Sequence, residues 1–287
     1  MGYKLGINVQ GGTGGLSVPE HIALIKEVGW DGFFTSWDPS RTEAWATAGA
    51  QSGLIYTSIH APFSQEHRIW IGGEEGEAEA NRLIACAEDC ARFDIPVMVL
   101  HTINGFSART PSAPTESGLK LYARIIEVAE RCGTKLAFEN TEREEFLHAV
   151  MNAFGHLSCV GFCFDSGHEH CYHNSDLLTR YGKKLCHTHL DDNFGVTGIG
   201  ATNKANEIDG AITWYDDSHL PPFDGSVDFS SAMRRIQACG YDGVLTFELS
   251  MKHKPERSTH KAYTDMTPEE FYRLTLERAR RVRDLAL

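Results

Sequence analysis

The feature that most constrains this chain is a repeated unit, in which a short apolar segment leads through a polar loop into an amphipathic helix. Segments that are apolar along nearly their whole length are typical of parallel strands buried on both faces. Eight such strands are predicted, at Lys4–Val9, Gly32–Trp37, Ile55–Ile59, Val97–His101, Lys135–Glu139, Val160–Asp165, Leu185–Leu190 and Val244–Leu249.

Helices are predicted between the strands, where apolar residues recur at spacings of three and four. The first, Val18–Val28, has Ser17 as its N-cap and Pro19 just inside its start, and the last, Thr267–Leu285, opens in the same way on Thr-Pro. Glycines close many of these helices, as left-handed C-terminal caps favour. The remaining helices are predicted at Glu77–Phe93, Gly118–Cys132, Glu144–Phe154 and Phe229–Cys239.

This alternation of strands and helices predicts an α/β fold with a parallel sheet. An open, doubly wound sheet is the alternative. Eight units of roughly this length favour a closed (β/α)8 TIM barrel, whose functional site lies at the C-terminal mouth of the strands. No linker or change of composition marks a second domain, so residues 1–287 are predicted to form a single TIM-barrel domain.

Composition bears on the setting of the protein. The formal net charge is −12 and no run of Lys or Arg is present, so we do not expect nucleic acid as a partner. The eight cysteines include no CxxC pair, which indicates reduced thiols. No signal-peptide pattern follows Met1 and no apolar stretch is long enough to span a bilayer. We therefore expect a soluble, cytoplasmic protein without membrane association, and homo-oligomerisation stays open.

Ionisable side chains stand at the ends of six predicted strands. Chemistry in a TIM barrel collects where the strands run out into loops. A carboxylate or imidazole directly after an apolar run is costly to bury unless it is paired or bound to a metal. Six that meet at one mouth therefore indicate a metal site, and they are His60, His101, Glu139, Asp165, His189 and Glu248.

Structural alternatives exist for these residues. His60 or His101 alone is compatible with a hydrogen-bonded structural role, and Asp165 could cap a helix that follows it through Ser166 and Gly167. Alternation along the seventh strand places His187 on the same face as His189. His189 lies nearer the mouth, so His187 is expected to support it from below.

A long connection, residues 192–216, follows the seventh strand and is a candidate lid. A rigid turn comes after it. Its Pro-Pro and Gly in segment 217–229 would present Asp217 and His219 as a fixed pair, while Asp228 is predicted to cap the next helix.

Together these motifs resemble the xylose isomerase-like TIM-barrel superfamily, which includes sugar phosphate isomerases and epimerases, inosose dehydratases and endonuclease IV. The resemblance spans essentially the whole chain. An arginine that epimerases often carry after the strand-seven histidine is replaced by Gly195. The motifs that carry the resemblance are Phe138-Glu139-Asn140, Asp165-Ser166-Gly167-His168, His189-Leu190-Asp191-Asp192, the segment from Asp217 to Asp228, and Phe247-Glu248.

The resemblance implies a set of metal ligands. Glu139, Asp165, His189 and Glu248 match the residues that bind one Mn, Co or Mg ion in the epimerase-like members, and His168 matches a substrate contact. In endonuclease IV further ligands complete a three-zinc cluster. The residues that match them are possible additional metal or substrate ligands here, namely His60, His101, His168, Asp217 and His219.

The chemistry expected of such a site is proton transfer. Three carboxylates and one imidazole suit Mn²⁺, Mg²⁺ or Co²⁺, and binding by the additional histidines would favour Zn²⁺. A bound ion would polarise a carbonyl, while Glu139 and Glu248 remove and return a proton through a metal-bound enediolate. We therefore predict a metal-dependent isomerase or epimerase for a small sugar, sugar phosphate or related polyol ketone. An inosose-type dehydratase and a zinc-dependent phosphodiesterase of the endonuclease IV type are the alternatives.

Loop residues supply weaker expectations about the substrate, a small carbohydrate. No nucleotide-binding glycine motif is present, so no nucleotide cofactor is expected. Aromatic residues that could face a sugar are Trp37, Phe63, Trp70 and Phe106, and cations that could meet a phosphate or carboxylate are Arg68, Arg109 and Lys252.

Overall fold

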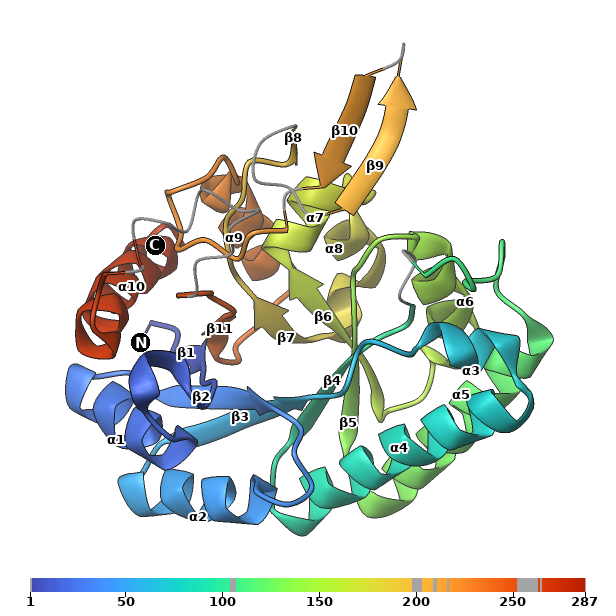
Figure 1. Ribbon diagram of the computed structural model, residues 1–287, viewed down its shortest axis with the longest axis horizontal. Coiled ribbons are helices and arrows are strands. Elements are labelled where there is room, and N and C mark those ends of the chain that lie inside the picture. The colour runs from blue at the N-terminus through green and yellow to red at the C-terminus, as the bar shows by residue number, and fades with distance from the viewer. Residues whose placement is uncertain are drawn as a thin grey trace.

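The computed structural model describes residues 2–103, 107–197, 203–208, 211–215, 217–251, 263 and 265–286. Eight parallel strands form a nearly closed barrel with helices around its outside (Figure 1). This confirms the predicted (β/α)8 TIM barrel. The barrel strands are β1 (Leu5–Asn8), β2 (Gly32–Ser36), β3 (Ile55–His60), β4 (Val97–His101), β5 (Lys135–Glu139), β6 (Val160–Asp165), β7 (Leu185–His189) and β11 (Leu245–Phe247).

Strand order follows the chain from β1 to β7, and β11 returns to pair with β1. The barrel closes between β7 and β11 through a single bridge from Leu190 to Phe247, in which the Leu190 amide donates to the Thr246 carbonyl at 2.9 Å. β11 is shorter than the predicted 244–249. Glu248 therefore lies just beyond the last paired residue, at the rim.

The long helices lie close to the predicted positions, except α2, which was not predicted. Ser17 and Glu20 form a capping box at the first helix, and Thr267 and Glu270 form another at the last. The long helices are α1 (Val18–Val28), α2 (Thr42–Ser52), α4 (Gly73–Arg92), α5 (Glu116–Cys132), α6 (Glu144–Phe154), α9 (Phe229–Ala238) and α10 (Pro268–Asp284).

Several short helices were not predicted. They are α3 (His67–Ile71), α7 (Ser166–Tyr172) and α8 (Leu177–Tyr181), with 3₁₀ turns η1 (Thr13–Gly15) and η2 (Gly182–Lys184). α7 starts directly at the end of β6, and its sequence SGHEHCY has too little apolar periodicity to be recognised as a helix. Among the described residues, no helix combines the length and apolar character needed to cross a membrane.

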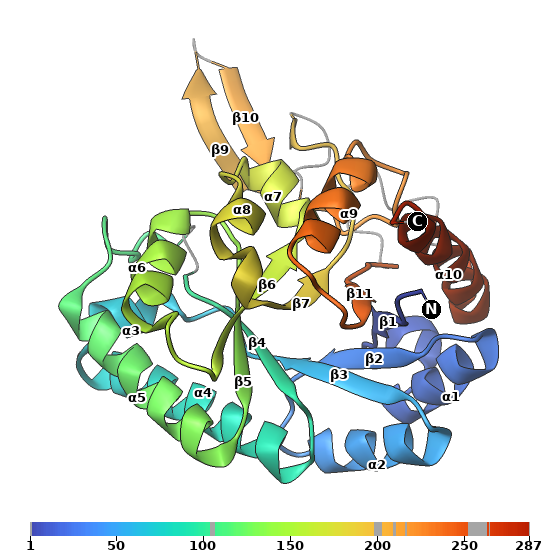
Figure 2. The same ribbon diagram turned by 180° about the vertical axis from the view of Figure 1, so that it is seen from behind.

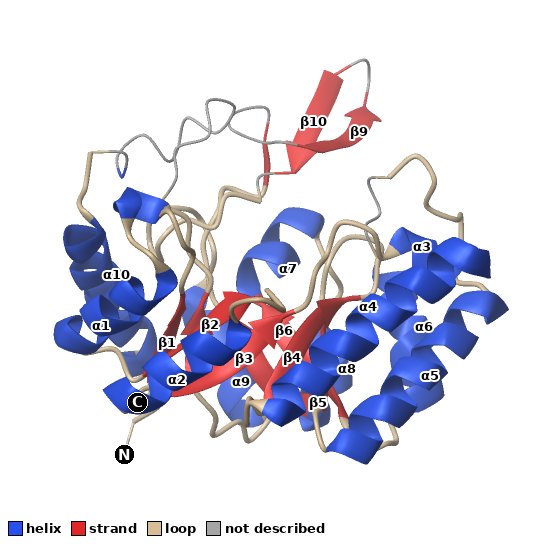
Figure 3. Ribbon diagram, turned by 60° about the horizontal axis from the view of Figure 1, so that its bottom comes forward, coloured by secondary structure: helices blue, strands red, loops and turns tan. Residues whose placement is uncertain are grey.

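A second, three-stranded antiparallel sheet lies within the long connection after β7. Its strands are β8 (Val196–Thr197), β9 (Asn203–Ile208) and β10 (Ala211–Tyr215), in the order β8-β10-β9. β9 and β10 project away from the barrel, as Figures 2 and 3 show. The sequence left this segment without secondary structure, and its role as a lid stays a prediction.

Two packing environments determine where side chains at strand ends point. Leu136 and Phe138 belong to the large core between barrel and helices, whereas Ala137 belongs to a small cluster that includes Val99 and Cys163. Because side chains alternate along a strand, Glu139 continues the row of Ala137. Its carboxylate is thereby directed to the inside of the barrel at the mouth.

One carboxylate is buried in the wall behind the mouth. Glu66 precedes α3, is 1% exposed, and neither of its carboxylate oxygens has a hydrogen-bond partner among the described residues. Burial, helped by the neighbouring Glu79 carboxylate and opposed by Arg82, raises the pKa of Glu66 to about 8. The protein therefore folds with a neutral carboxyl at this position below about pH 8.

This burial predicts a pH-dependent loss of stability. Since the folded-state pKa lies above the unfolded value of 4.5, the folded state holds the extra proton, and stability falls as pH rises from the unfolded pKa through the folded one. The upper bound of the loss is about 5 kcal/mol, from 1.36 kcal/mol per pKa unit. Denaturant unfolding from pH 5 to pH 9 should show this loss, and Glu66→Gln should flatten it. Glu74→Gln, an exposed change on α4, is the control. Equal pH profiles for Glu66→Gln and the wild type would contradict the assignment.

Candidate metal centre

Glu139 is the central side chain of the barrel mouth. It ends β5, is completely buried, and meets histidines from three other strands. Its Oε2 lies 3.3 Å from His60 Nε2 and 3.2 Å from His101 Nε2, and its Oε1 lies 2.9 Å from His189 Nδ1. One carboxylate is thus surrounded by imidazoles contributed by β3, β4 and β7.

His189 joins Glu139 to Glu248. Its Nδ1 lies 2.8 Å from Glu248 Oε2, and its ring stacks on Phe34 at a centroid distance of 4.7 Å. One ligand atom from each of four residues, His60, Glu139, His189 and Glu248, lies within 4.8 Å of every other, a separation compatible with one shared cation.

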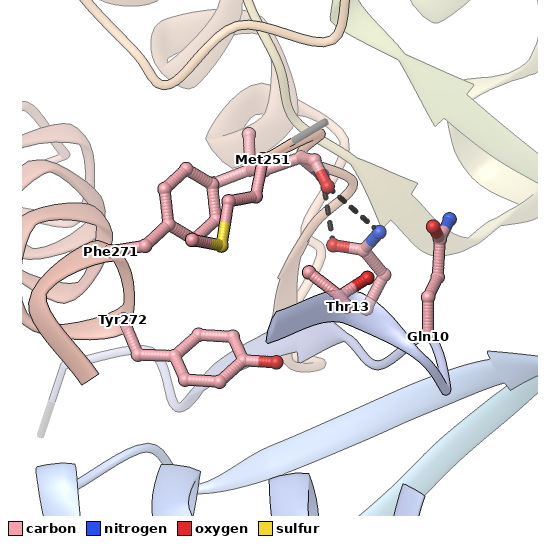
Figure 4. Close-up of a pocket in the computed structure, with 7 residues that line it drawn as sticks. Gln10, Thr13, Met251, Phe271 and Tyr272 are labelled. Carbon is pink, nitrogen blue, oxygen red and sulfur yellow. Dashed lines mark hydrogen bonds between the residues drawn. The ribbon is translucent and has the colours of Figure 1, made fainter. Parts of the chain in front are cut away.

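Asn8 fixes the position of Glu248 after the short strand β11. The Asn8 side-chain amide donates to the Leu249 carbonyl at 2.9 Å and accepts from the Leu249 backbone amide at 2.9 Å. These two hydrogen bonds take the place of the backbone hydrogen bonds between strands that end with β11 at Phe247. The same corner is a pocket lined by uncharged side chains from β1, η1, α10 and the segment after β11, including Gln10, Thr13 and Met251 (Figure 4).

A second group of ligands lies beside the first. His168 Nε2 is 3.6 Å from Asp217 Oδ1, and His219 Nε2 is 3.2 Å from the same oxygen. The rigid turn expected after the seventh strand therefore does bring Asp217 and His219 together. His168, from α7, also approaches Glu139, with its Nδ1 3.6 Å from Oε1. His101, Glu139 and His168 form a further group of ligand spacing, so the two sets are continuous.

The histidines are oriented by acceptors behind them. His60 Nδ1 lies 2.7 Å from the Ala61 carbonyl, and His168 Nδ1 lies 2.9 Å from the Asn140 carbonyl. Because a carbonyl oxygen only accepts, each Nδ1 carries the hydrogen and each Nε2 faces the carboxylates. A ring held by its far nitrogen with the near nitrogen directed inward is the usual arrangement of a metal-ligating histidine.

Asp165 lies at the end of β6, but it is not part of the tight group around His189. Its Oδ1 accepts from the His168 amide at 2.6 Å and so caps α7, as its alternative reading expected. Its Oδ2 is buried and has no hydrogen-bond partner among the described residues. That oxygen remains available for a cation, and ligation by Asp165 stays a prediction.

The electrostatics show how strongly the carboxylates depend on positive neighbours. Burial alone would raise the pKa of Glu248, yet His189 lowers it to about 2. Burial would likewise raise the pKa of Glu139, and His189 with the other imidazoles holds it well below its usual range. Burial would lower the pKa of His168, but Asp165 and the other nearby carboxylates raise it to about 9.

The donor set fits a divalent cation. Several completely buried oxygens and nitrogens converge on one mouth, including Asp165 Oδ2 and His189 Nε2, which have no hydrogen-bond partner among the described residues. Buried charges of this kind are stable only when they are paired or when they coordinate a metal. His187 lies below His189 as expected, with its Nε2 3.1 Å from the Ser58 hydroxyl.

Several loop residues expected at the substrate have other roles. Trp70 is 1% exposed and donates to the Thr102 carbonyl, so it is part of the core and offers no face to a sugar. Trp37 is tied to Asp89 on α4. Phe63, in contrast, is 51% exposed and contacts the rings of His60 and His101.

Arg68 and Arg109, expected as cations at the substrate, share one carboxylate. Glu75 lies 2.8 Å from Arg109 Nη1 and 3.5 Å from Arg68 Nε. Phe106 and Lys252 lie outside the described residues. Asp191 was not among the predicted site residues. It is completely buried, and its Oδ2 lies 3.1 Å from His219 Nδ1. Its place inside the His189-Leu190-Asp191-Asp192 motif was the signal that could have found it.

The fold and this mouth define a class of protein. The chain belongs to the xylose isomerase-like TIM barrel family, whose model matches residues 22–268. It is 26% identical over 274 residues to the uncharacterized protein y4fM of Sinorhizobium fredii, with 80% of each chain covered.

Solved structures share the fold over nearly their whole length. An apo crystal structure of the 3-keto-D-glucoside 4-epimerase YcjR from E. coli matches with a TM-score of 0.68 and 18% identity, covering 97% of this chain and 99% of that one. A structure of D-psicose 3-epimerase in the presence of D-fructose matches with a TM-score of 0.68 and 14% identity, covering 99% and 100%. At these identities the likeness establishes the architecture.

The donor set predicts that a divalent ion stabilises the protein. Protein treated with a chelator and then given Mn²⁺, Co²⁺ or Zn²⁺ should unfold at a higher temperature, because an ion at 100 times its Kd adds about 2.7 kcal/mol to the folded state. Glu139→Gln should abolish most of this shift in unfolding temperature, because it removes a charged ligand that both histidines of the first group, His60 and His189, contact. Glu75→Gln, a change in an ion pair away from the cluster, should keep it. An unchanged shift in Glu139→Gln would mean that the ion binds elsewhere.

Proposed function

We propose that this protein is a divalent-metal-dependent isomerase or epimerase that acts on a small sugar, sugar phosphate or related polyol ketone. The observation that carries the proposal is the placement of Glu139 and Glu248 on either side of the His189 Nδ1 atom, at 2.9 and 2.8 Å. Two carboxylates that converge on one site are what transfer of a proton away from a carbon and back to it requires. The shared fold with YcjR and with D-psicose 3-epimerase supports this choice.

Ligands for the ion would be Glu139, His189 and Glu248, together with Asp165 through its available oxygen or His60 through its Nε2. A bound divalent ion supplies Lewis acidity, which polarises a ketose carbonyl and acidifies the neighbouring C–H group. The mixture of carboxylates and imidazoles accommodates Mn²⁺, Co²⁺ or Zn²⁺.

Glu139 and Glu248 differ in solvent exposure, which suggests different roles in proton transfer. The Glu139 side chain is completely buried, whereas that of Glu248 is 19% exposed. Glu248 can therefore exchange a proton with solvent, and Glu139 can hold a proton away from water during the reaction. Phe63, exposed above His60 and His101, is placed to contact an apolar face of the substrate.

The proposal predicts exchange of a carbon-bound hydrogen with solvent. Protein loaded with Mn²⁺ in D₂O should incorporate deuterium into one or more ketoses of a panel, measured by mass spectrometry and located by NMR. Glu248→Gln should lower the exchange rate by about 10²–10⁴-fold, the usual contribution of a general acid or base. Glu74→Gln, exposed on α4, should retain it. Absence of exchange from every ketose, with the ion shown to be bound, would rule the proposal out.

A zinc-dependent phosphodiesterase is the second candidate, because the group of His168, Asp217 and His219 provides room for additional ions. Against it stand the acidic mouth loops, in which the Glu75 carboxylate lies 2.8 Å from Arg109 and 3.5 Å from Arg68. Zinc-loaded protein should therefore leave a DNA duplex with an abasic site intact. Cleavage by protein holding three zinc ions would replace the first proposal with this one.

A further inference from the structure

Asp192 is a buried carboxylate to which the proposed proton transfer assigns no role. It follows His189, the last residue of β7, by three positions and is 0% exposed. Its backbone pairs with Leu220 in both directions: the Asp192 amide donates at 2.9 Å and the Leu220 amide donates at 2.8 Å. The chain just after β7 is thereby joined to the turn 217–229.

The Asp192 side chain accepts four backbone hydrogen bonds, each at 2.9 Å. Oδ1 accepts from the amides of Asn193 and Val227. Oδ2 accepts from the amides of Phe223 and Gly225. Hydrogen bonds to an ionised acceptor are stronger than those between neutral groups. Because three of the four donors belong to the turn, Asp192 determines the path that the turn takes.

The backbone of the turn depends on such support. Phe223 has a φ of 73° and His219 has a φ of 51°, a region that residues with a side chain rarely occupy. Backbone of this kind persists when its surroundings fix it, and at Phe223 the hydrogen bond to Asp192 does so. Gly225 leaves room for the carboxylate, since a Cβ atom there would lie 2.4 Å from Asp192 Oδ1 and 2.4 Å from the Asn193 carbonyl oxygen.

His219 joins the turn to the segment that carries Glu248. The His219 carbonyl accepts from the Ser250 amide at 2.9 Å. Its Nδ1 lies 3.2 Å from the Glu248 carbonyl and donates to it, because a carbonyl oxygen only accepts. The residue between them, Leu249, is held by Asn8. Residues 248–250 are therefore held jointly by β1 and by the turn.

We propose that Asp192 is a positioning residue for Glu248 and acts through the turn and His219. The hydrogen bonds to Asp192 fix the turn, and the turn fixes the Glu248 carbonyl and the Ser250 amide. Glu248 is thereby held with its Oε2 2.8 Å from His189 Nδ1. The inference rests on the proposed proton transfer, in which Glu248 exchanges a proton with solvent. It assigns Asp192 no contact with the substrate or the ion.

Asp192→Asn is the matched test, because it keeps the size of the side chain and one accepting oxygen. The amide nitrogen that replaces the other oxygen only donates, so the two hydrogen bonds of that oxygen are lost. With saturating Mn²⁺, the kcat for deuterium exchange into a ketose that the wild type exchanges should fall by about 10–100-fold, since a misplacement of about 1 Å can cost that much. KM should not change.

The control is a variant that loses stability without moving the turn. Asp176→Ala removes the exposed side chain that caps α8. It should lower the unfolding temperature, because a helix cap is lost, and keep the wild-type kcat.

A double variant separates positioning of Glu248 from general support of the mouth. If Asp192 acts through Glu248, Asp192→Asn should lower exchange much less in protein that already carries Glu248→Gln than in the wild type. If Asp192 supported the whole mouth, the two losses would multiply.

Backbone amide exchange followed by NMR tests the geometry without any substrate. In Asp192→Asn the Ser250 amide, which donates to His219, should exchange with water faster than in the wild type, whereas the Leu249 amide, which donates to Asn8, should keep its protection. Gly225→Ala, which displaces the turn with the carboxylate intact, should give the same pattern and replaces Asp192→Asn if that variant does not fold.

Four results would overturn the inference. They are a wild-type kcat in Asp192→Asn, a raised KM at unchanged kcat, an effect that multiplies with that of Glu248→Gln, and wild-type exchange of the Ser250 amide in the variants. If the wild type exchanges no ketose, the proposed function fails by itself. The amide measurement then still decides whether Asp192 controls the position of Glu248.

Discussion

Closure of the barrel between β7 and β11 is the constraint on which the rest of the structure depends. The bridge from Leu190 to Phe247 and the side-chain clamp of Asn8 on Leu249 join the last strand to both of its neighbours. Glu248 can reach His189 only because this closure brings residues from the end of the barrel beside residues from its middle. An open sheet would leave β7 and β11 at opposite edges, and the cluster at the mouth would not form.

The cluster itself combines opposing demands. Carboxylates and imidazoles are taken out of water together, and some stay charged through their neighbours: His189 holds the pKa of Glu139 and of Glu248 low, and the carboxylates in turn hold the pKa of His168 and of His189 high. Removing one member of such a buried network costs stability, because its partners lose the charge that compensates them. A divalent cation would replace the imidazolium charges as the partner of the carboxylates, which connects the electrostatics to the proposed chemistry.

The mouth is also asymmetric in a way that matters for function. The group around Glu139 lies deepest, where β3, β4, β5 and β7 converge, whereas the group of His168, Asp217 and His219 lies under the connections that follow β6 and β7. Asn8 supports the first group by holding the segment after β11. Because function resides in such sites and not in the fold, these ligand groups, and not the barrel, decide the reaction.

What the sequence determined by itself is the architecture and the residues at the strand ends. The strands 97–101, 135–139 and 160–165 are apolar to their last residue, so their ends, and the polar residues there, could be read directly. The sequence could not reveal α2 or α7, because small and polar residues hide the helical period in TEAWATAGAQS and SGHEHCY. Tertiary structure alone decided which polar residues meet: that His60 approaches Glu139, that Trp70 is buried, and that Asp191 faces His219. The physical reason is that alternation gives the face on which a side chain lies, whereas its partner depends on strand stagger and on loops that pack only after the barrel has closed.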